Sequence, residues 1–441
     1  MANKAYPPSI CPGIPRLGKC PTGWTTCTFG DVLTVVERLV PIADESVYQL
    51  VTAKRNRGGI VPREQLKGRE IKTQGQYTVR KGDFLIGNRQ IIHGACGIVP
   101  ESLDGAIVSG EYTVLLPKKG LWLPWLAYFA HTVHFQQTCF QSSIGVDVEK
   151  MVFKVDWWLK QLLHVPPLAE QKHIVEILST WADAIEQTRT FVSAAKRRKD
   201  DLLQKVLNGQ TRLPSFASVE KRIFGVSTHR EKILANGDVP NDWQPYRIYE
   251  LGQVVSGGTP DTGNPNFWGG EISWITPSEI TSLPTPFVSE TKRTLSKSGL
   301  KSSSATLLPA NSLIVCTRAT VGDCAINLVP MTTNQGFKNV IVLKDKIDVV
   351  FLYYWICLHK NVLLRLASGS TFVEVSKNNF ENILINCPTL PEQRAIAAVL
   401  STADDEISGL EAEVNALERQ KKGLMQQLLT GKMRVRTSKT I

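Results

Sequence analysis

The sequence predicts an α+β fold: two tandem strand-rich globular domains, each followed by a long helix, with the two helices pairing as an antiparallel coiled coil. Three observations predict this fold. The phrase LAEQKHIVEILST at residues 168–180 returns as LPEQRAIAAVLST at residues 390–402. Apolar residues downstream of each copy recur at heptad spacing. Upstream of each copy, short β-branched and aromatic runs are separated by Gly, Pro and Asn.

The repeat defines the order of the domains. Residues 166–213 align without a gap with residues 388–435, at a constant offset of 222 residues. The tracts upstream also correspond, because GWTTCTFGDV resembles DWQPYRIYEL and KGDFLIGNR resembles ANSLIVCTR. A repeat of this length indicates two structural units in tandem. The expected division is a first domain at residues 1–165, its helix at 166–213, a linker and second domain at 214–387, and a second helix with a C-terminal tail at 388–441.

Runs such as GDFLIG, YTVLL, SLIVCT and FKNVIVL predict the strands of the globular domains, because Gly, Pro and Asn turns separate them. Each domain then ends in a shorter apolar and aromatic helix, starting near Leu121 and Phe351. The aromatic side chains of these helices follow helical spacing. We therefore expect them to pack in the domain cores rather than to stack on bases.

The two long helices carry start and stop signals as well as a seam. Prolines precede each helix, Glu170 and Glu392 lie in the first turns, and Gly209 and Gly431 follow the ends. At roughly 34 residues each helix would span about 50 Å, comparable with one to one and a half turns of B-DNA at about 34 to 36 Å per turn. The residues expected to pair the helices are Ile174, Leu178, Trp181, Ile185, Val192, Lys199, Leu202, Ile396, Leu400, Ile407, Leu410, Val414, Leu417, Lys421 and Leu424.

Only Lys199 and Lys421 interrupt this seam, at the same position in both copies. A polar residue at one seam position commonly fixes the register or the number of partners. The alternative is a lysine whose ammonium reaches solvent near the end of the helix. The sequence leaves both interpretations open.

Charge indicates where a nucleic acid would bind. The chain has 51 Lys and Arg against 40 Asp and Glu, a net charge of +11, and most of the excess lies outside the two helix tracts. Density is highest at residues 54–89, where the basic residues face only Glu64, Glu70 and Asp83. A solvated basic face is the default explanation, but this density among Gln, Asn and Thr favours contact with phosphates and base edges. The candidate DNA-binding residues are Lys54, Arg55, Arg57, Arg63, Lys67, Arg69, Lys72, Arg80, Lys81 and Arg89 in the first domain, and Lys292, Arg293, Lys297, Lys301 and Arg318 in the second.

Two motifs mimic active sites. NPNFW at residues 264–268 approaches an adenine-methyltransferase motif, but Asn266 replaces its second proline and no Gly-rich cofactor loop lies upstream. Pro260 and Asp261 with Glu290 and Lys292 imitate a nuclease pattern that is short enough to arise by accident. The chain also lacks a phosphate-binding GxxxxGK[ST] loop. We expect no catalytic residue and no bound cofactor.

Metal and membrane sites are not expected either. Nine cysteines are scattered without a CxxC pair, and His131 and His134 near Cys139 are better explained as packed residues than as metal ligands. No apolar run reaches the roughly 18 residues of a membrane span, and the first residues lack the features of a signal peptide. We therefore expect a cytoplasmic protein.

These residues together identify a family. The chain resembles the specificity (S) subunit of type I restriction-modification systems in PPLAEQKHIVEILST, PTLPEQRAIAAVLST and the helix ends LLQKVLNG and LMQQLLTG. VVSGGTPDTGNPNFWGGEISWITPSEI, TTNQGF and SGSTF in the second domain are also similar. The resemblance covers nearly the whole chain. The first domain departs more, because it has DGAIVSGEY where the second has TTNQGF.

The resemblance implies that each globular domain is a target recognition domain reading one half of an interrupted double-stranded DNA sequence, while the helices set the unread spacer. It also implies that the helices dock two modification subunits, which use S-adenosylmethionine to methylate adenine N6, and that restriction subunits, which use ATP and Mg²⁺, join the complex. Alternatives are the specificity subunit of a type II-like bifunctional system, a self-contained methyltransferase or nuclease, and a structural coiled-coil adaptor.

Overall fold

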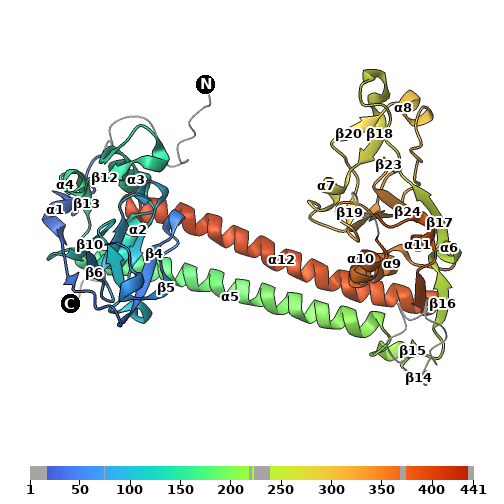
Figure 1. The fold of residues 1–441 in the computed structure, drawn as a ribbon, viewed down its shortest axis with the longest axis horizontal. Coiled ribbons are helices and arrows are strands. Elements are labelled where there is room, and N and C mark those ends of the chain that lie inside the picture. The colour runs from blue at the N-terminus through green and yellow to red at the C-terminus, as the bar shows by residue number, and fades with distance from the viewer. Residues whose placement is uncertain (1–16, 74, 218–220, 223–238, 368–373, 436–441) are drawn as a thin grey trace. The chain divides into compact units, whose positions relative to one another are not determined.

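The computed structural model describes residues 17–73, 75–217, 221–222, 239–367 and 374–435 (Figure 1). The chain divides into two compact units. The first unit contains Met1–Thr188 and Glu413–Ile441, and the second contains Arg189–Ala412. Each unit therefore combines one globular domain with half of each long helix. The first domain, up to residue 165, and the second domain with its linker, the described residues of 214–387, follow in turn.

The first domain contains two main sheets. The four-stranded sheet has the antiparallel order β2-β10-β7-β8, and the five-stranded sheet has the order β3-β6-β9-β4-β5. The shorter pairs are β1-β13 and β11-β12. The strands are β1 (Thr25–Thr28), β2 (Leu33–Val35), β3 (Leu39–Val40), β4 (Val47–Ala53), β5 (Ile60–Lys67), β6 (Gln76–Thr78), β7 (Phe84–Gly87), β8 (Cys96–Ile98), β9 (Ile107–Ser109), β10 (Tyr112–Pro117), β11 (Ser143–Ile144), β12 (Val152–Phe153) and β13 (Leu162–Val165).

Short helices close the core of this domain. They are α1 (Phe29–Val32), α2 (Leu123–Phe129), α3 (Val133–Gln141) and α4 (Val155–Trp158), with 3-10 turns η1 (Arg55–Arg57), η2 (Gly68–Glu70), η3 (Ile91–His93), η4 (Glu101–Leu103) and η5 (Val148–Lys150). Phe29 stacks on Trp158 with ring centroids 4.0 Å apart. Trp125 of α2 is fully buried and stacks on Phe129. The expectation that the aromatic residues of this helix belong to the core is confirmed.

The second domain contains a five-stranded sheet of order β17-β24-β21-β22-β19, a three-stranded sheet β20-β18-β23 and the pairs β16-β25 and β14-β15. Its strands are β14 (Lys221–Arg222), β15 (Val239–Pro240), β16 (Gln244–Arg247), β17 (Gly252–Ser256), β18 (Trp268–Ile275), β19 (Phe287–Val288), β20 (Arg293–Leu295), β21 (Leu313–Cys316), β22 (Cys324–Asn327), β23 (Met331–Thr333), β24 (Phe337–Val342) and β25 (Leu384–Cys387). Its helices are α6 (Ile248–Leu251), α7 (Pro277–Ile280), α8 (Lys297–Lys301), α9 (Val349–Leu358), α10 (Lys360–Leu366) and α11 (Lys377–Glu381), with η6 (Pro214–Phe216) and η8 (Pro265–Phe267).

The two domains share one plan. In both, an early strand pairs antiparallel with the last strand before the long helix, β1 with β13 and β16 with β25. The order β2-β10-β7-β8 in the first domain corresponds to β17-β24-β21-β22 in the second. The tandem repeat seen in the sequence therefore extends from the helices into the sheets.

Helix α9 places its aromatic residues in the second core, as expected, because Phe351 and Tyr354 are almost completely buried. In the part of the chain that the structure describes, no single helix is long and apolar enough to span a membrane. Among the described helices, α9 and α10 have the length and composition for it only as a pair, and they meet at an angle of 67°.

The long helices α5 (Leu168–Leu207) and α12 (Leu390–Leu429) have 40 residues each, somewhat more than the sequence pattern predicts. Both are followed by glycines in the left-handed region, Gly209 with φ +66° and Gly431 with φ +68°. In the second unit, Lys196 pairs with Glu411 and Lys199 with Asp404, so the numbering of the two helices runs in opposite directions. The predicted fold class, α+β with two paired long helices, is confirmed.

Candidate nucleic-acid interface and helix ends

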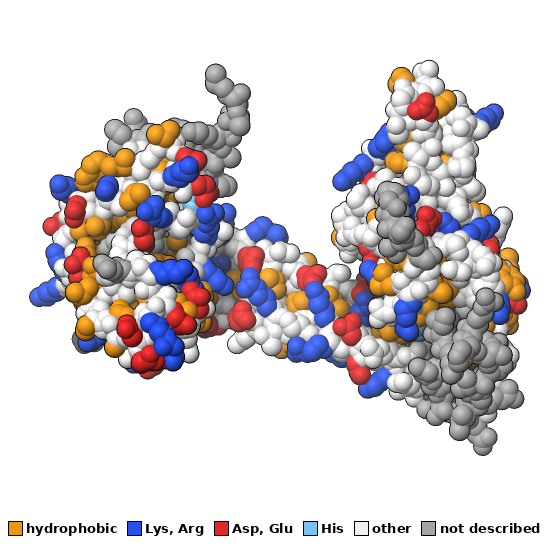
Figure 2. Space-filling view, viewed as in Figure 1, with side chains coloured by type: hydrophobic (Ala, Val, Ile, Leu, Met, Phe, Trp, Pro, Cys, Tyr) orange, Lys and Arg blue, Asp and Glu red, His pale blue; other side chains and the backbone are white. Residues whose placement is uncertain are grey.

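The basic tract of the first domain lies among carboxylates, most of which come from outside the tract. Glu45 binds both Lys67 and Arg69, with N–O distances of 3.3 and 2.8 Å. Further ion pairs join Arg55 to Glu149, Arg63 to Glu64, Lys81 to Glu101 and Arg89 to Glu111. Figure 2 shows blue and red side chains interspersed over this domain. The local positive charge is therefore smaller than the sequence suggests.

These pairs are exposed and do not lock the cations in place. The side chains of Arg89 and Glu111, for example, are 60% and 50% accessible. Exposed ion pairs contribute only about 0 to 1 kcal/mol. A phosphate can therefore replace such a carboxylate at little cost. Lys54 and Arg80 are exposed as well.

Arg57 is placed differently from an exposed DNA-binding cation. It is half-buried in η1 with φ +57°, and its backbone N–H donates to Gly94 O at 2.8 Å. Its Nε is buried and has no hydrogen-bond partner among the described residues. Burial lowers the pKa of this guanidinium. The structure therefore assigns the stem and Nε of Arg57 to packing against η3.

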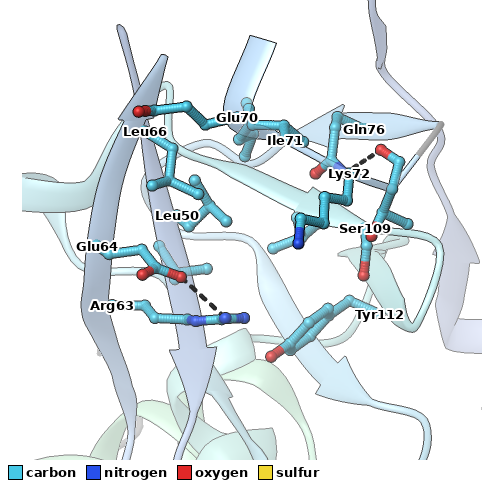
Figure 3. A pocket seen from close by; sticks show the side chains of 14 residues that line it. Leu50, Arg63, Glu64, Leu66, Glu70, Ile71, Lys72, Gln76, Ser109 and Tyr112 are labelled. Carbon is cyan, nitrogen blue, oxygen red and sulfur yellow. Dashed lines mark hydrogen bonds and ion pairs between the residues drawn. The ribbon is translucent and has the colours of Figure 1, made fainter. Parts of the chain in front are cut away.

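A hollow of about 290 Å³ lies beside β5 in the first domain. Figure 3 shows Arg63 and Glu64 joined on one wall and Lys72 on the opposite side. Glu70 and Tyr112 also line it. The hollow is thus lined by both cations and carboxylates. Two of the predicted DNA-binding residues, Arg63 and Lys72, line it from opposite sides.

The second domain has a hollow of a different composition, with a volume of about 360 Å³. It lies where α7 follows β18, where residues 318–319 follow β21 and where residues 334–336 join β23 to β24. Its lining residues are Pro277, Ser278, Arg318, Ala319, Asn334, Gln335 and Gly336. Of these, sequence reasoning proposed only Arg318 as a contact. The motif TTNQGF contains Asn334, Gln335 and Gly336, and ITPSEI contains Pro277 and Ser278, so these two motifs were the signals that could have added most of the others.

Arg293 lies on an aromatic platform in the same domain. Its guanidinium carbon is 3.5 Å from the centroid of the Trp268 ring and 5.3 Å from that of Trp274. The two indoles are held in turn, because Trp268 donates to Asp261 O and Trp274 to Gly258 O. Arg293 remains exposed, so the platform orients a cation at the surface. The other predicted lysines, Lys292, Lys297 and Lys301, are exposed too.

Each long helix begins with a buried Glu that binds an Arg located beyond the end of the other helix. In the second unit, Arg212 binds Glu392 through Nε at 2.8 Å and Nη2 at 2.6 Å, and it also binds Asp242. In the first unit, Arg434 binds Glu170 through Nε and Nη2, both at 2.8 Å. We call these contacts the helix-end ion pairs. Arg212 and Arg434 occupy the same repeat position, an identity that could have indicated this contact.

The surroundings raise the pKa of both arginines. Burial lowers the pKa of Arg212, but its hydrogen bonds to Glu392 and Asp242 outweigh that effect. For Arg434, the hydrogen bond to Glu170 is the largest cause. Both guanidinium groups therefore stay charged and bidentate.

The glutamines next to these glutamates fix the neighbouring domain. Gln171 accepts from the backbone N–H of Trp122 at 2.8 Å and donates to Gly120 O at 2.7 Å. Gln393 accepts from the N–H of Asp348 at 2.8 Å and donates to Lys346 O at 3.1 Å. Trp122 and Asp348 are the N-cap residues of α2 and α9. The repeated Glu-Gln pair therefore joins each long helix to its domain.

The ends of the long helices enter the other repeat's core. Leu428 and Leu429 of α12 belong to the first core, and Val206 and Leu207 of α5 belong to the second. A side chain at Gly209 or Gly431 would collide with a proline, because an added Cβ would lie 2.3 Å from Pro240 or Pro21. The apolar pattern of the helices thus serves two purposes, pairing and completion of the cores.

The predicted seam residues divide between these two purposes. Ile174 and Leu178 pack in the first core, and Ile396 and Leu400 in the second. The other seam residues that are buried are Ile185, Val192 and Ile407. Trp181, Leu202, Leu410, Val414, Leu417 and Leu424 are half-buried.

The two seam lysines lie over tyrosines of the domains. The Nζ of Lys199 is 5.5 Å from the centroid of the Tyr354 ring, and that of Lys421 is 5.6 Å from the Tyr128 ring. Lys199 also pairs with Asp404, which accepts from the Tyr354 hydroxyl at 2.7 Å. Ala182 occupies the position in the first repeat that Asp404 has in the second.

The discounted motifs are parts of turns. Asn264 accepts from the N–H of Asn266 at the start of η8, and Asp261 accepts from the N–H of Gly263. His134 contacts Leu162 O, and Cys139 is fully buried. Among the described residues there is no group of three or more His, Cys, Asp and Glu side chains that could hold a metal ion. The resemblance motif SGSTF lies outside the described residues.

Comparison with known proteins follows the same division into two domains. The family model described as "Type I restriction modification DNA specificity domain" matches residues 21–191 and again residues 240–419. The chain is 34% identical over 185 residues to the type I restriction enzyme MjaIX specificity subunit of Methanocaldococcus jannaschii, covering 42% of this chain and 43% of that one. It is 28% identical to the putative MjaX specificity subunit of the same organism, covering 63% and 61%. The matches thus span about half of these relatives' own length.

Solved structures show the same fold. The HsdS subunit from Thermoanaerobacter tengcongensis superimposes with a TM-score of 0.55 at 18% identity, covering 94% of this chain and 99% of that one. A chain from a study of complex assembly and conformational transition of the type I R-M system gives a TM-score of 0.63 at 19% identity, covering 94% and 100%.

Proposed function

This chain belongs to the family of type I restriction-modification specificity subunits, and from that premise we propose that it is the DNA sequence-recognition subunit of such a complex. Each globular domain reads one half of an interrupted, two-part target. The observation that carries the proposal is the doubled plan, in which two domains of one topology are each joined to a long helix by a matching Glu-Gln pair. Two similar domains with different surfaces suit two different half-sites.

The helices set the length of the unread spacer. Each is continuous over 40 residues, or about 60 Å at ~1.5 Å per residue. Each contributes to both units, so its length is coupled to both domains. The exposed cations of both domains supply the phosphate contacts, and polar side chains such as Asn334 and Gln335 supply candidates for base contact.

Other subunits carry out the chemistry. In this proposal two modification subunits dock on the paired helices and methylate adenine N6 with S-adenosylmethionine, and restriction subunits with ATP and Mg²⁺ cut unmodified DNA. The chain itself binds none of these cofactors and acts in the cytoplasm. The proposed partners of the chain are double-stranded DNA and these subunits.

Methylation mapping tests the proposal. Long-read sequencing of host DNA, with and without this gene and with the modification partner present, should show loss of N6-methyladenine at one interrupted motif. The map would identify both half-sites together. An unchanged map, in cells where the partner is shown to be expressed, would contradict the proposal.

A heptad insertion tests the spacer role. Seven residues inserted in both helices, after Lys196 and before Glu411, keep the seam in register because these two residues pair across the helices. The insertion adds about 10 Å per helix. We expect the same half-sites with a spacer longer by about three base pairs at ~3.4 Å each. An insertion in α5 alone is the control, since it breaks the register. Changed half-sites would contradict the spacer role.

A further inference from the structure

We infer that the hollow of the second domain lined by Ser278, Arg318, Asn334 and Gln335 binds a DNA group that presents hydrogen-bond acceptors, either phosphate oxygens or the N7 and O6 edge of guanine. We call it the donor hollow. This inference rests on the proposed function and names the chemistry that one of the two domains reads.

Asn334 is oriented by a backbone donor. The N–H of Gly336 donates to its Oδ1 at 2.8 Å. A backbone N–H can only donate, so the oxygen end of this amide is fixed and used. Among the described residues no group accepts from the amide NH₂ of Asn334, which lines the hollow. Asn334 therefore keeps both NH₂ donors for a ligand, while its oxygen already accepts one hydrogen bond.

Gln335 repeats this arrangement. Its Oε1 accepts from the hydroxyl of Thr259, which leaves its NH₂ end for a ligand. Arg318 lines the same hollow, and a guanidinium can only donate. No carboxylate side chain lines this hollow, whereas Glu64 and Glu70 line the hollow of the first domain. The second hollow is therefore lined by two amides and a guanidinium, without a carboxylate.

The loops around the donor hollow are held in place. The N–H of Thr317 donates to Gly336 O at 2.9 Å, and Ala319 has φ +64°, a region that alanine seldom adopts. A Cβ at Gly336 would lie 3.1 Å from Asn334 Oδ1 and 3.5 Å from Pro277. Gly336 thus keeps the hollow open, and the donors are positioned before DNA arrives.

This geometry disfavours adenine. Asn or Gln reads adenine through two bonds, one donated to N7 and one accepted from N6. The oxygens of Asn334 and Gln335 each already accept one hydrogen bond, from Gly336 and from Thr259. The N7 and O6 edge of guanine and the oxygens of a phosphate present acceptors only, so they match the NH₂ donors of the two amides.

The test uses the full chain assembled with its modification partners, and a duplex containing the motif found by methylation mapping. Asn334→Asp and Gln335→Glu replace donors by acceptors without changing the shape of the side chain. Asn334→Asp also keeps the acceptor for the Gly336 N–H. Gln253→Glu is the matched control, because Gln253 is exposed on β17 and pairs with Ile341, at the other end of β24 from Gly336.

We expect each hollow variant to weaken binding about tenfold relative to the control. Thermal melting identifies a variant that does not fold, and the binding of the other variant then tests the inference. If the wild type binds the duplex and the hollow variants bind as tightly as the control, the inference is overturned but the proposed function is not. Failure of the wild-type complex to bind any mapped duplex overturns the proposed function as well.

Modified duplexes then distinguish the two ligands. A 7-deazaguanine at one position of the half-site should weaken the wild type but not Asn334→Asp if guanine is read. If a phosphate is bound, a single methylphosphonate in the backbone should weaken binding by the wild type but not by Asn334→Asp. Sensitivity of both proteins to every substitution, or of neither, overturns the inference, because the hollow would then make no acceptor contact.

Discussion

The two units repeat their helix-end ion pairs but differ in their hollows. Glu170 with Arg434 and Glu392 with Arg212 have the same bidentate geometry at equivalent positions. The first hollow mixes carboxylates with cations, and the second contains donors without carboxylates. The repeated ion pairs join two helices that pair with each other, so both copies must fit the same helix pair. The hollows need not fit a common structure, and the proposed recognition of two different half-sites requires them to differ.

The ion pairs also differ in one informative way. Arg212 has a second carboxylate, Asp242, while the equivalent position in the first repeat is Gly23. Arg434 instead contacts Thr22 O, and Trp24 donates to Glu170 at 3.1 Å. The corresponding Trp243 Nε1 is buried without a partner among the described residues. The same Arg-Glu ion pair is therefore supported by different neighbouring groups in the two units.

The largest expected effect tests the shared attachment. Arg212→Ala and Arg434→Ala should each cost about 3 to 5 kcal/mol of unfolding free energy, because each leaves a buried glutamate without its cation. Glu392 and Glu170 are only 1% and 4% accessible. Urea unfolding measures the effect, and Arg365→Ala at an exposed position is the control. A loss below about 1 kcal/mol would mean that the helix-end ion pairs do not attach the helices.

A smaller effect should follow the loss of Lys199. Lys199→Met removes an ion pair with Asp404 and the contact with the Tyr354 ring, and it should cost about 1.5 kcal/mol. The same unfolding assay measures this cost. An unchanged unfolding free energy would show that the ion pair with Asp404 adds nothing to stability.

Charge neutralisation tests the reading surface of the first domain. Arg55→Gln and Lys72→Gln should each weaken DNA binding and lower the slope of log affinity against log salt by about 0.9 per lost phosphate contact. Arg57→Gln should change the unfolding free energy and leave this slope unchanged, because Arg57 packs against Gly94. Titration of the assembled complex at several salt concentrations measures the slope. A reduced slope for Arg57→Gln would contradict its interior role.

The smallest effect concerns thiols. Burial raises the pKa of Cys96 from 9.0 to about 12 and that of Cys387 likewise to about 12. A folded pKa above the unfolded value means that the stability from these neutral thiols is complete below pH 9 and lost as pH rises towards 12. Both thiols should therefore stay unalkylated by iodoacetamide at pH 8, which peptide mass spectrometry can follow. Labelling at the rate of the urea-unfolded chain would contradict their burial.

Local patterns allowed much of the fold to be predicted. The repeat, the seam and the turn residues fixed two domains and two long helices, because each of these signals lies within a short stretch of chain. The helix-end ion pairs escaped, because Glu170 and Arg434 are brought together by pairing between repeats. For the same reason, the sequence did not show which carboxylates lie beside the basic tract. The carboxylates of Glu45 and Glu149 approach the basic tract only after the domain folds.

The candidate reading sites depended still more on tertiary structure. Arg318 was named from its charge, but its neighbours Ser278 and Asn334 come from two other loops. The donor character of Asn334 depends on one hydrogen bond from Gly336. The spacing of residues in the sequence does not predict that hydrogen bond. The motif TTNQGF indicated only the segment in which it forms.

The crossing of the helix ends has a consequence for synthesis of the chain. Leu428 and Leu429 complete a core whose first members, such as Trp24, are made more than 400 residues earlier. While the ribosome is still translating, this apolar surface of the first domain has no cover. We expect the core of the nascent first domain to stay incomplete until the end of α12 has been synthesised. The second domain can complete its core earlier, because its part of α5 has already been synthesised.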